Sequence, residues 1–596
     1  MKSKTKISNK NFIIENKITI LLAIIIFALA MLANARFFGM GLMEYDAVIK
    51  LVTHSAKTPL IDVFTMPDHS YISSYNSYRP VPTFSWWIIS SFAGMDFVPY
   101  QWLNFVLHAA CCVLLFLLAK VLFEDKKGYF SFFGALIFAF HPIQLSAVLY
   151  VSCAPDLWVA LFSLLSIIFF LNYLKKKKYS FFWLSFLFCA LGIFSKEIGA
   201  AIPILLFIIA LIFSNEKKIK TRIIYNVQLI APFFALIVFY VVMMYLVLGR
   251  VLMNFADVQL PLGVLLSDFF RFLFYPIDIF KTNISASYYD LFLNYFANVA
   301  GVILFAAIFV VLALYFIRKK KKIELLILLW LVLLVILFSA VKIIHPRYMY
   351  SALIPFSLIF AFALKKFAKI PRKIIFGKNH IVQKIGLVII GLFAIYFISF
   401  SGLFYNYSEQ WAVQEINTNY LQGVVFSAAD LPANEEIILV NYPVYFISAQ
   451  KNFDYLIQLS NGASVQALFD YYFPDKNFRV SSITAVYPSS PEFELMFVRL
   501  EDCVFVAKSF DKSKGYLLVG NSDSLPGENS YFVKIYEEVN SNAENKELLG
   551  TKNSSKAQNF IITFPRRNWQ NTVIFSFDGK TIKKYYFGNA CSTKIN

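Results

Sequence analysis

The sequence predicts a membrane protein that is all-α over its first two thirds and ends in a β-rich domain of mixed α+β type. Of its 596 residues, 59% are hydrophobic and only 15% are charged, which is more apolar surface than a soluble globular protein buries. Apolar runs long enough to cross roughly 30 Å of hydrocarbon recur up to residue 404. After Ser408 the chain changes to polar stretches that alternate with short strand-like runs. The predicted domains are therefore 1–404, which spans the membrane, and 405–596, which does not.

The apolar runs predict about 11 transmembrane helices in the first domain. Each run has the length and the low charge content of a membrane span. They lie near 18–36, 101–122, 129–146, 157–174, 179–195, 198–214, 223–247, 297–317, 323–341, 349–364 and 385–404.

The charge distribution predicts the orientation of these spans. Residues 1–404 contain 38 Lys and Arg against 16 Asp and Glu, and 27 of the 38 cations fall in alternate short segments, namely 1–17, 124–128, 175–178, 215–222, 318–322 and 365–384. Positively charged loops stay in the cytoplasm. The N-terminus is thus predicted to be cytoplasmic, and an odd number of spans places 405–596 outside a cell (inner) membrane. The basic charge reflects topology and predicts no nucleic-acid partner.

Two long segments fall on the predicted outer face, at about 37–100 and 248–296. The first ends in the Trp-rich stretch "FSWWIISSFAGM", which is too short to span and is typical of a helix lying in the membrane interface. The second contains "LLSDFFRFLFYPIDIF", which predicts an interfacial or re-entrant helix. The cytoplasmic loops are short, so chemistry is expected on the outer face.

Ionisable residues gather at the predicted outer ends of the spans. Such groups cost roughly 2.5–3.5 kcal/mol each at membrane depth, so they usually face a cavity or a partner. For each one a structural role is also open: a lone cation can snorkel, "HP" can simply end a helix, and acids at 44 and 46 can be solvated loop residues. The candidates are Glu44, Asp46, Arg79, His108, His141, Asp156, Lys196, Glu197, Arg271 and Arg347.

Several motifs occur together in one order. They are "YRPVPTFSWWIISSF", "WLNFVLHAACCVLLFLLAKVLF", "ALIFAFHPIQLSAVLYVSCAPDLWVALF", "FSKEIGAAIPILLF", "RFLFYPIDI" and "PRYMYSALIPF". Over about residues 40–365 the chain resembles the membrane part of the TMTC family of protein O-mannosyltransferases, within the GT-C glycosyltransferases. The tetratricopeptide repeats of that family are absent here and the β-rich segment stands in their place.

The resemblance implies a multi-pass enzyme that takes a sugar from a polyprenyl-phosphate donor on the outer face. The family's catalytic acid in the first outer loop falls on Asp46, and Glu44 is a close substitute for the second acid that relatives often carry. His141, Pro142 and Asp156 match the family pattern, whereas Gln144, Ser146 and Ala154 replace a His, a Glu and an Arg.

For such a donor the lipid phosphate is already a good leaving group, so no general acid is needed, in contrast to glycoside hydrolysis. A carboxylate must accept the proton of the acceptor hydroxyl, and cations must stabilise the charge that grows on the departing phosphate. Asp46 fits the first role. The predicted substrate-binding residues are Arg79, His141, Asp156, Lys196, Glu197, Arg271, Arg347 and Tyr348, with Arg favoured where two oxygens are gripped at once.

The expected partners are a polyprenyl-phosphate-linked sugar, a hydroxyl acceptor on a protein, lipid or surface glycan, and membrane lipids. No cofactor is certain from the sequence, and assistance by a divalent cation (Mg²⁺ or Mn²⁺) is left open. Two other classes of function are open at this point. A flippase or transporter for polyprenyl-linked sugars would need charges at mid-membrane and paired broken helices, and a non-catalytic scaffold would tolerate alanine throughout the charged set.

Overall fold

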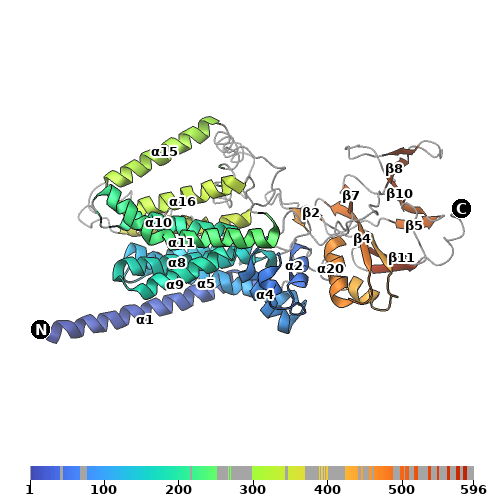
Figure 1. Cartoon of the computed structure of the whole chain (residues 1–596), viewed down its shortest axis with the longest axis horizontal. Helices are drawn as coiled ribbons and strands as arrows, with labels where there is room; N and C mark the ends of the chain where they lie inside the picture. The colour runs from blue at the N-terminus through green and yellow to red at the C-terminus, as the bar shows by residue number, and fades with distance from the viewer. Residues whose placement is uncertain are drawn as a thin grey trace.

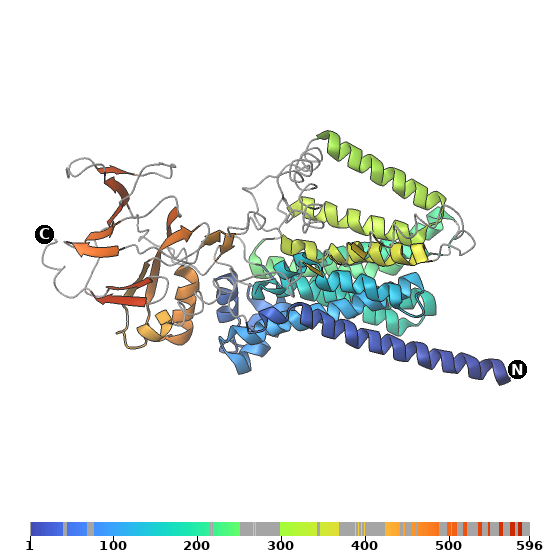
Figure 2. The same cartoon turned by 180° about the vertical axis from the view of Figure 1, so that it is seen from behind.

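The protein was analysed as a computed structural model, which describes residues 2–39, 45–67, 77–250 apart from 215 and 217, 299–341, 346–368, 423–440 and 462–487. Several isolated residues and short strands of the C-terminal region are described as well. Figures 1 and 2 show a bundle of long helices at the N-terminal side and a separate, strand-containing region at the opposite end of the molecule.

Ten helices make up the described part of the bundle. Neighbours along the chain pack side by side, as α8 does with α9 and α5 with α6, and α17 returns to pack on α6. The helices are α1 (Lys2–Ala33), α5 (Phe97–Phe123), α6 (Tyr129–Phe140), α8 (Ala154–Lys176), α9 (Tyr179–Ile193), α10 (Ala201–Phe213), α11 (Ile219–Leu248), α15 (Val299–Arg318), α16 (Lys322–Val341) and α17 (Leu353–Ala368).

The helical, multi-pass class predicted from the sequence is confirmed. Among the described residues four helices are long and apolar enough to cross a membrane, or up to five if one bent pair counts as a span, and four shorter apolar helices accompany them. The figure of 11 spans stays a prediction. Most of the predicted span 385–404 and of the predicted interfacial segment 248–296 lies outside the described residues.

The predicted span at 129–146 is not one straight helix. Helix α6 ends at Phe140, and the following short helices η3 (Pro142–Gln144) and α7 (Leu145–Val148) continue at an angle of 52° to it. Pro142 causes this break, because proline has no N–H to donate and disfavours helical dihedrals in the residue before it. His141 accordingly has extended backbone, with φ −64° and ψ 124°.

The two ends of the bundle differ in charge. The lysine-rich connections 124–128, 175–178 and 318–322 follow α5, α8 and α15. The opposite end, which we call the lysine-poor end, is built from α2 (Tyr45–Thr53), α4 (Pro80–Ala93), η4 (Val151–Cys153), η5 (Glu197–Ala200) and η6 (Pro346–Tyr350). The Trp-rich segment expected to lie in the interface forms α4, with 14 residues.

The C-terminal region contains two sheets and the helix α20 (Gly462–Tyr472), and residues 423–428 are helical as well. One sheet has the order β12-β11-β1-β4-β2-β3, with β7 also paired to β4, and the other has the order β5-β6-β10-β8-β9. Strand β1 is parallel to both β4 and β11. The β-rich class of 405–596 as a whole stays a prediction, because much of this segment lies outside the described residues.

The strands of the first sheet are β1 (Glu436–Val440), β2 (Tyr445–Ile447), β3 (Leu456–Gln458), β4 (Arg479–Tyr487), β7 (Tyr516–Gly520), β11 (Thr572–Phe577) and β12 (Ile582–Tyr586). Those of the second are β5 (Phe497–Glu501), β6 (Val504–Lys508), β8 (Lys534–Glu538), β9 (Lys546–Leu548) and β10 (Phe560–Thr563).

Two apolar cores hold the molecule together. The larger lies within the helix bundle. The smaller joins Val48 of α2 and Trp86 of α4 to Phe469 of α20 and Leu439 of β1. Figures 1 and 2 both show α20 beside α2 at the end of the bundle away from the N-terminus. The C-terminal region therefore sits on the lysine-poor end.

Candidate functional site

Two ion pairs lie at the lysine-poor end. Lys196 Nζ donates to Asp156 Oδ1 at 2.5 Å. Arg79 donates two hydrogen bonds to the Glu197 carboxylate, from Nε to Oε1 at 3.2 Å and from Nη2 to Oε2 at 2.9 Å. The Lys196 and Asp156 side chains are only 11% and 6% exposed, and Arg79 and Glu197 are 12% and 32% exposed. Because water is largely excluded from the first pair, each of its charges depends on the other.

The adjacent residues Lys196 and Glu197 thus pair with different elements. Asp156 comes from the first turn of α8, and Arg79 immediately precedes α4. The turn that carries the pair packs closely on the end of α9: a Cβ on Gly199 would lie 2.3 Å from the carbonyl oxygen of Gly192. Only glycine allows this approach, because a Cβ at position 199 would collide with a backbone carbonyl group that cannot move aside as a flexible side chain could.

Helix η6 adds an aromatic ring and a second cation to the Lys196–Asp156 pair. Lys196 Nζ lies 4.6 Å from the centre of the Tyr348 ring, and the guanidinium carbon of Arg347 lies 5.4 Å from the same ring. Arg347 Nη1 also contacts Cys153 Sγ of η4 at 3.7 Å. A ring that faces two cations stabilises both through its negative face. Four of the predicted substrate-binding residues, Asp156, Lys196, Arg347 and Tyr348, are therefore brought together.

The carboxylate partners of Arg79 and Lys196 affect how these two cations can bind an anion. Arg79 and Lys196 were expected from the sequence to bind the phosphate of a donor, yet each already has a carboxylate partner. The two pairs add no net charge to the site. An anion that enters here would share these donors with Glu197 and Asp156, and Lys196 has three N–H groups with which to do so.

His141 lies in a different environment. Its Nδ1 accepts a hydrogen bond from the Ile143 backbone N–H at 3.2 Å, and its ring packs edge-on against Phe356 with centroids 5.7 Å apart. The side chain is fully buried and caps the turn that follows Pro142. Its described contacts are those of a capping residue, and its assignment to substrate binding stays a prediction.

Asp46, the predicted catalytic base, is the second residue of α2. Its side chain, together with Glu44 and Arg271, lies outside the described residues. Helix α2 packs through Val48 and Leu51, which are buried in one cluster with Val151 and Ala154. Helix α2 consequently lies beside η4 and the start of α8, the elements that supply Cys153 and Asp156.

Two buried polar residues that were not predicted from the sequence lie on α2 or directly after it. Lys50 is 6% exposed and His54 is 1% exposed. Residues four apart lie on one face of a helix, so positions 46 and 50 share a face of α2, and His54 directly follows the last residue of the helix. The spacing was visible in the sequence, but burial of this face was not.

The described residues contain no group of three or more His, Cys, Asp and Glu side chains arranged to hold a metal ion. Involvement of Mg²⁺ or Mn²⁺ accordingly stays open, because Glu44 and the Asp46 side chain are not among the groups described.

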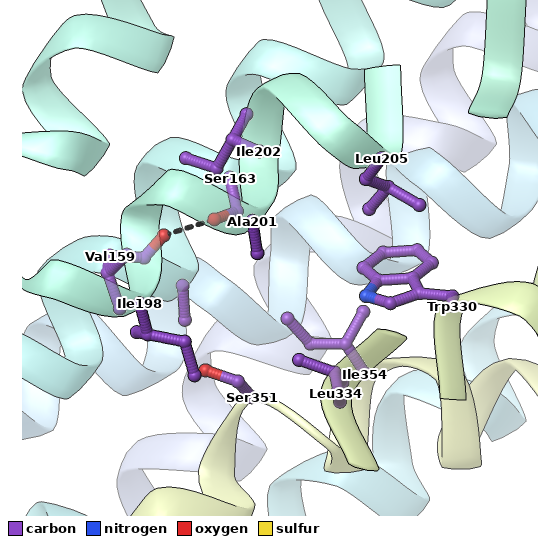
Figure 3. A pocket seen from close by; sticks show the side chains of 11 residues that line it. Val159, Ser163, Ile198, Ala201, Ile202, Leu205, Trp330, Leu334, Ser351 and Ile354 are labelled. Carbon is purple, nitrogen blue, oxygen red and sulfur yellow. Dashed lines mark hydrogen bonds between the residues drawn. The ribbon is translucent and has the colours of Figure 1, made fainter. Parts of the chain in front are cut away.

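A small cavity of about 30 Å³ lies between helices of the bundle. Figure 3 shows Val159 and Ser163 of α8, Ile198 of η5, Ala201 of α10 and Trp330 of α16 around it. Ser163 Oγ donates to the Val159 carbonyl at 2.6 Å, so its hydroxyl is occupied by its own helix. Ile198 directly follows Glu197 in the chain. The residues of the two ion pairs do not line this cavity.

Comparison with known proteins confirms the resemblance seen in the sequence. Residues 77–245 match the family described as dolichyl-phosphate-mannose-protein mannosyltransferase. Protein O-mannosyl-transferase TMTC2 of Homo sapiens is 33% identical over 130 residues, which are 21% of this chain and 15% of that protein. Protein O-mannosyl-transferase F38B6.6 of Caenorhabditis elegans is 26% identical over 131 residues, 21% of this chain and 19% of that protein. The chain thus spans less than one fifth of the length of these curated relatives.

The chain also has a distant structural likeness to a solved protein. The crystal structure of ArnT from Cupriavidus metallidurans bound to undecaprenyl phosphate has a TM-score of 0.43 at 9% sequence identity, and the match covers 79% of this chain and 92% of that one.

Proposed function

We propose that this chain, whose residues 77–245 are similar to the dolichyl-phosphate-mannose-protein mannosyltransferases, is an integral-membrane glycosyltransferase of the GT-C type. Its donor is a sugar joined to a polyprenyl phosphate, and its acceptor is a hydroxyl group on a protein, lipid or surface glycan. The reaction takes place at the lysine-poor end, on the extracytoplasmic face of the membrane.

One observation carries the proposal. Arg79, Asp156, Lys196 and Glu197 all fall within the segment that resembles the family, and they form a partly buried cluster with Arg347 and Tyr348. The resemblance of residues 77–245 to the dolichyl-phosphate-mannose-protein mannosyltransferases supports a donor in which a lipid is joined to the sugar through phosphate. The cations of this cluster suit such a phosphate.

In the proposed reaction, the acceptor oxygen attacks the anomeric carbon and forms the new C–O bond. The bond between that carbon and the phosphate oxygen breaks, and its electron pair stays with the leaving phosphate. Asp46 accepts the proton of the acceptor hydroxyl. Arg347 and Lys196 stabilise the charge on the phosphate. A single displacement of this kind inverts the configuration at the anomeric carbon.

Transfer by the purified protein tests the proposal. We expect label to move from a radiolabelled polyprenyl-phosphate sugar, with mannose as the first sugar to try, to a hydroxyl acceptor, and no label to move from the corresponding nucleotide sugar. Analysis of the product's anomeric configuration checks inversion. Transfer from the nucleotide sugar alone would overturn the assigned donor class, and translocation of the intact lipid-linked sugar in proteoliposomes without transfer would favour a flippase.

Replacing Arg347 tests its assignment to the phosphate. We expect Arg347→Lys to lower kcat/KM for the donor by about tenfold, because lysine keeps the charge but loses the two-pronged grip on two phosphate oxygens. Steady-state kinetics with varied donor concentration give the value. Arg318→Lys, at the opposite end of the bundle in α15, is the matched control and should leave kcat/KM unchanged. Equal behaviour of the two variants would remove Arg347 from the site.

A further inference from the structure

Helix α2 packs directly against the C-terminal region. Val48 and Leu51 on one face of α2 are buried in the same cluster as Leu468 and Phe469 of α20. This cluster also contains Val480 of β4 and Phe575 of β11. The apolar core of the C-terminal region is therefore completed by the helix that carries Asp46.

Polar contacts fix the chain just after α2. Lys57 Nζ donates to the carbonyl oxygen of Tyr471 at 2.8 Å and lies 3.6 Å from the centre of the Tyr471 ring. The ammonium group is thus held by a hydrogen bond and a cation–π contact on one residue of α20. On the other side, the Ala56 N–H donates to Ser90 Oγ at 2.6 Å and the Trp87 indole N–H donates to the Thr58 carbonyl at 3.1 Å. Segment 56–58 is consequently held between α4 and α20.

Helix α2 has little to hold it by itself. It contains only nine residues, and isolated helices of this length are marginal in water because nucleation is costly. Its order must come from tertiary contacts, and those on one face are made by α20. A base that takes a proton in the transition state loses much of its effect when its position varies by about 1 Å.

From these contacts we infer that the C-terminal region is a brace for the catalytic helix, with Lys57 and Tyr471 as positioning residues that act on Asp46 through α2. This inference rests on the proposed function, because it concerns the residue assigned as base. Under this inference, residues 405–596 contribute to turnover by positioning α2 and supply no group that touches the substrate.

Tyr471→Ala and its neighbour Tyr472→Ala are a matched pair of variants. The Tyr471 ring packs against the shared core and faces Lys57, whereas the Tyr472 side chain is 47% exposed. We expect Tyr471→Ala to lower kcat about fivefold and to leave KM for the donor unchanged, because the ionic cluster that meets the donor is untouched. Tyr472→Ala should behave as wild type. Lys57→Arg should retain activity and Lys57→Met should lose it to a similar degree, since arginine keeps both contacts.

Hydrogen–deuterium exchange on the full-length protein in detergent supplies a readout that does not depend on activity. In Tyr471→Ala, the amides of α2 should exchange faster than in wild type, while those of α5 stay protected and the apparent unfolding temperature is unchanged. Unaltered exchange in α2, or faster exchange throughout the chain, would contradict the inference that the C-terminal region positions α2. A wild-type protein with no transfer activity would instead refute the proposed function, and the exchange result would still decide whether α20 orders α2.

Discussion

Purified Asp46→Asn protein is expected to transfer sugar at least about 100-fold more slowly than wild type at saturating donor. An amide cannot accept the proton of the attacking hydroxyl, and general-base catalysis contributes typically 10²- to 10⁴-fold. KM for the donor should change little, because the carboxylate is assigned to the acceptor's proton. Transfer from a radiolabelled polyprenyl-phosphate sugar, followed to initial rates, measures both quantities.

Two companion variants make this result specific. Asp62→Asn replaces an acid of the same segment that lies on a different helix, α3 (Asp62–Thr65), and should leave the rate unchanged. Glu44→Gln tests whether the second acid of the loop shares the role, in which case its rate would fall to a similar extent. Turnover by Asp46→Asn at the wild-type rate would remove the base assignment altogether.

The second large effect concerns stability. We expect Lys196→Met to lower the free energy of unfolding by about 3–5 kcal/mol, because it leaves the carboxylate of Asp156 buried without its cation. The double variant Lys196→Met with Asp156→Asn should recover more than half of this loss, since no uncompensated charge remains. Unfolding of the purified protein in mixed micelles of increasing SDS fraction, monitored by tryptophan fluorescence, gives the difference between variants.

An exposed ion pair of the same chain provides the control. Lys366 Nζ and Glu324 Oε1 are 3.4 Å apart, and the Lys366 side chain is 59% exposed. Lys366→Met should cost no more than about 1 kcal/mol, because the Lys366 ammonium is already largely solvated in the pair, although the Glu324 side chain is only 15% exposed. A similar loss for Lys196→Met would mean that the Lys196–Asp156 pair is solvated and does not hold η5 to α8.

The sequence was sufficient for the parts of this protein that depend on local chemistry. Apolar runs predicted membrane helices because the lipid interior admits only segments that satisfy their own backbone hydrogen bonds. The break of α6 at His141 was foreseeable from Pro142, which was noted as a possible helix terminator. The clustering of ionisable groups at one end followed from the order of the spans, and the order of the motifs was enough to suggest the family.

The pairing of those groups was decided only by the tertiary structure. Lys196 and Glu197 are neighbours in the sequence, yet they pair with Asp156 and Arg79 from two other elements. The fold brings these partners within contact distance, and the order of residues along the chain does not. Lys50 is buried, and the contact between Lys57 and Tyr471 joins residues that are 414 positions apart in the sequence. Periodicity and composition describe each segment alone. They carry no information about which segments meet, and that is what determines where a charge is compensated and which helix is held in place.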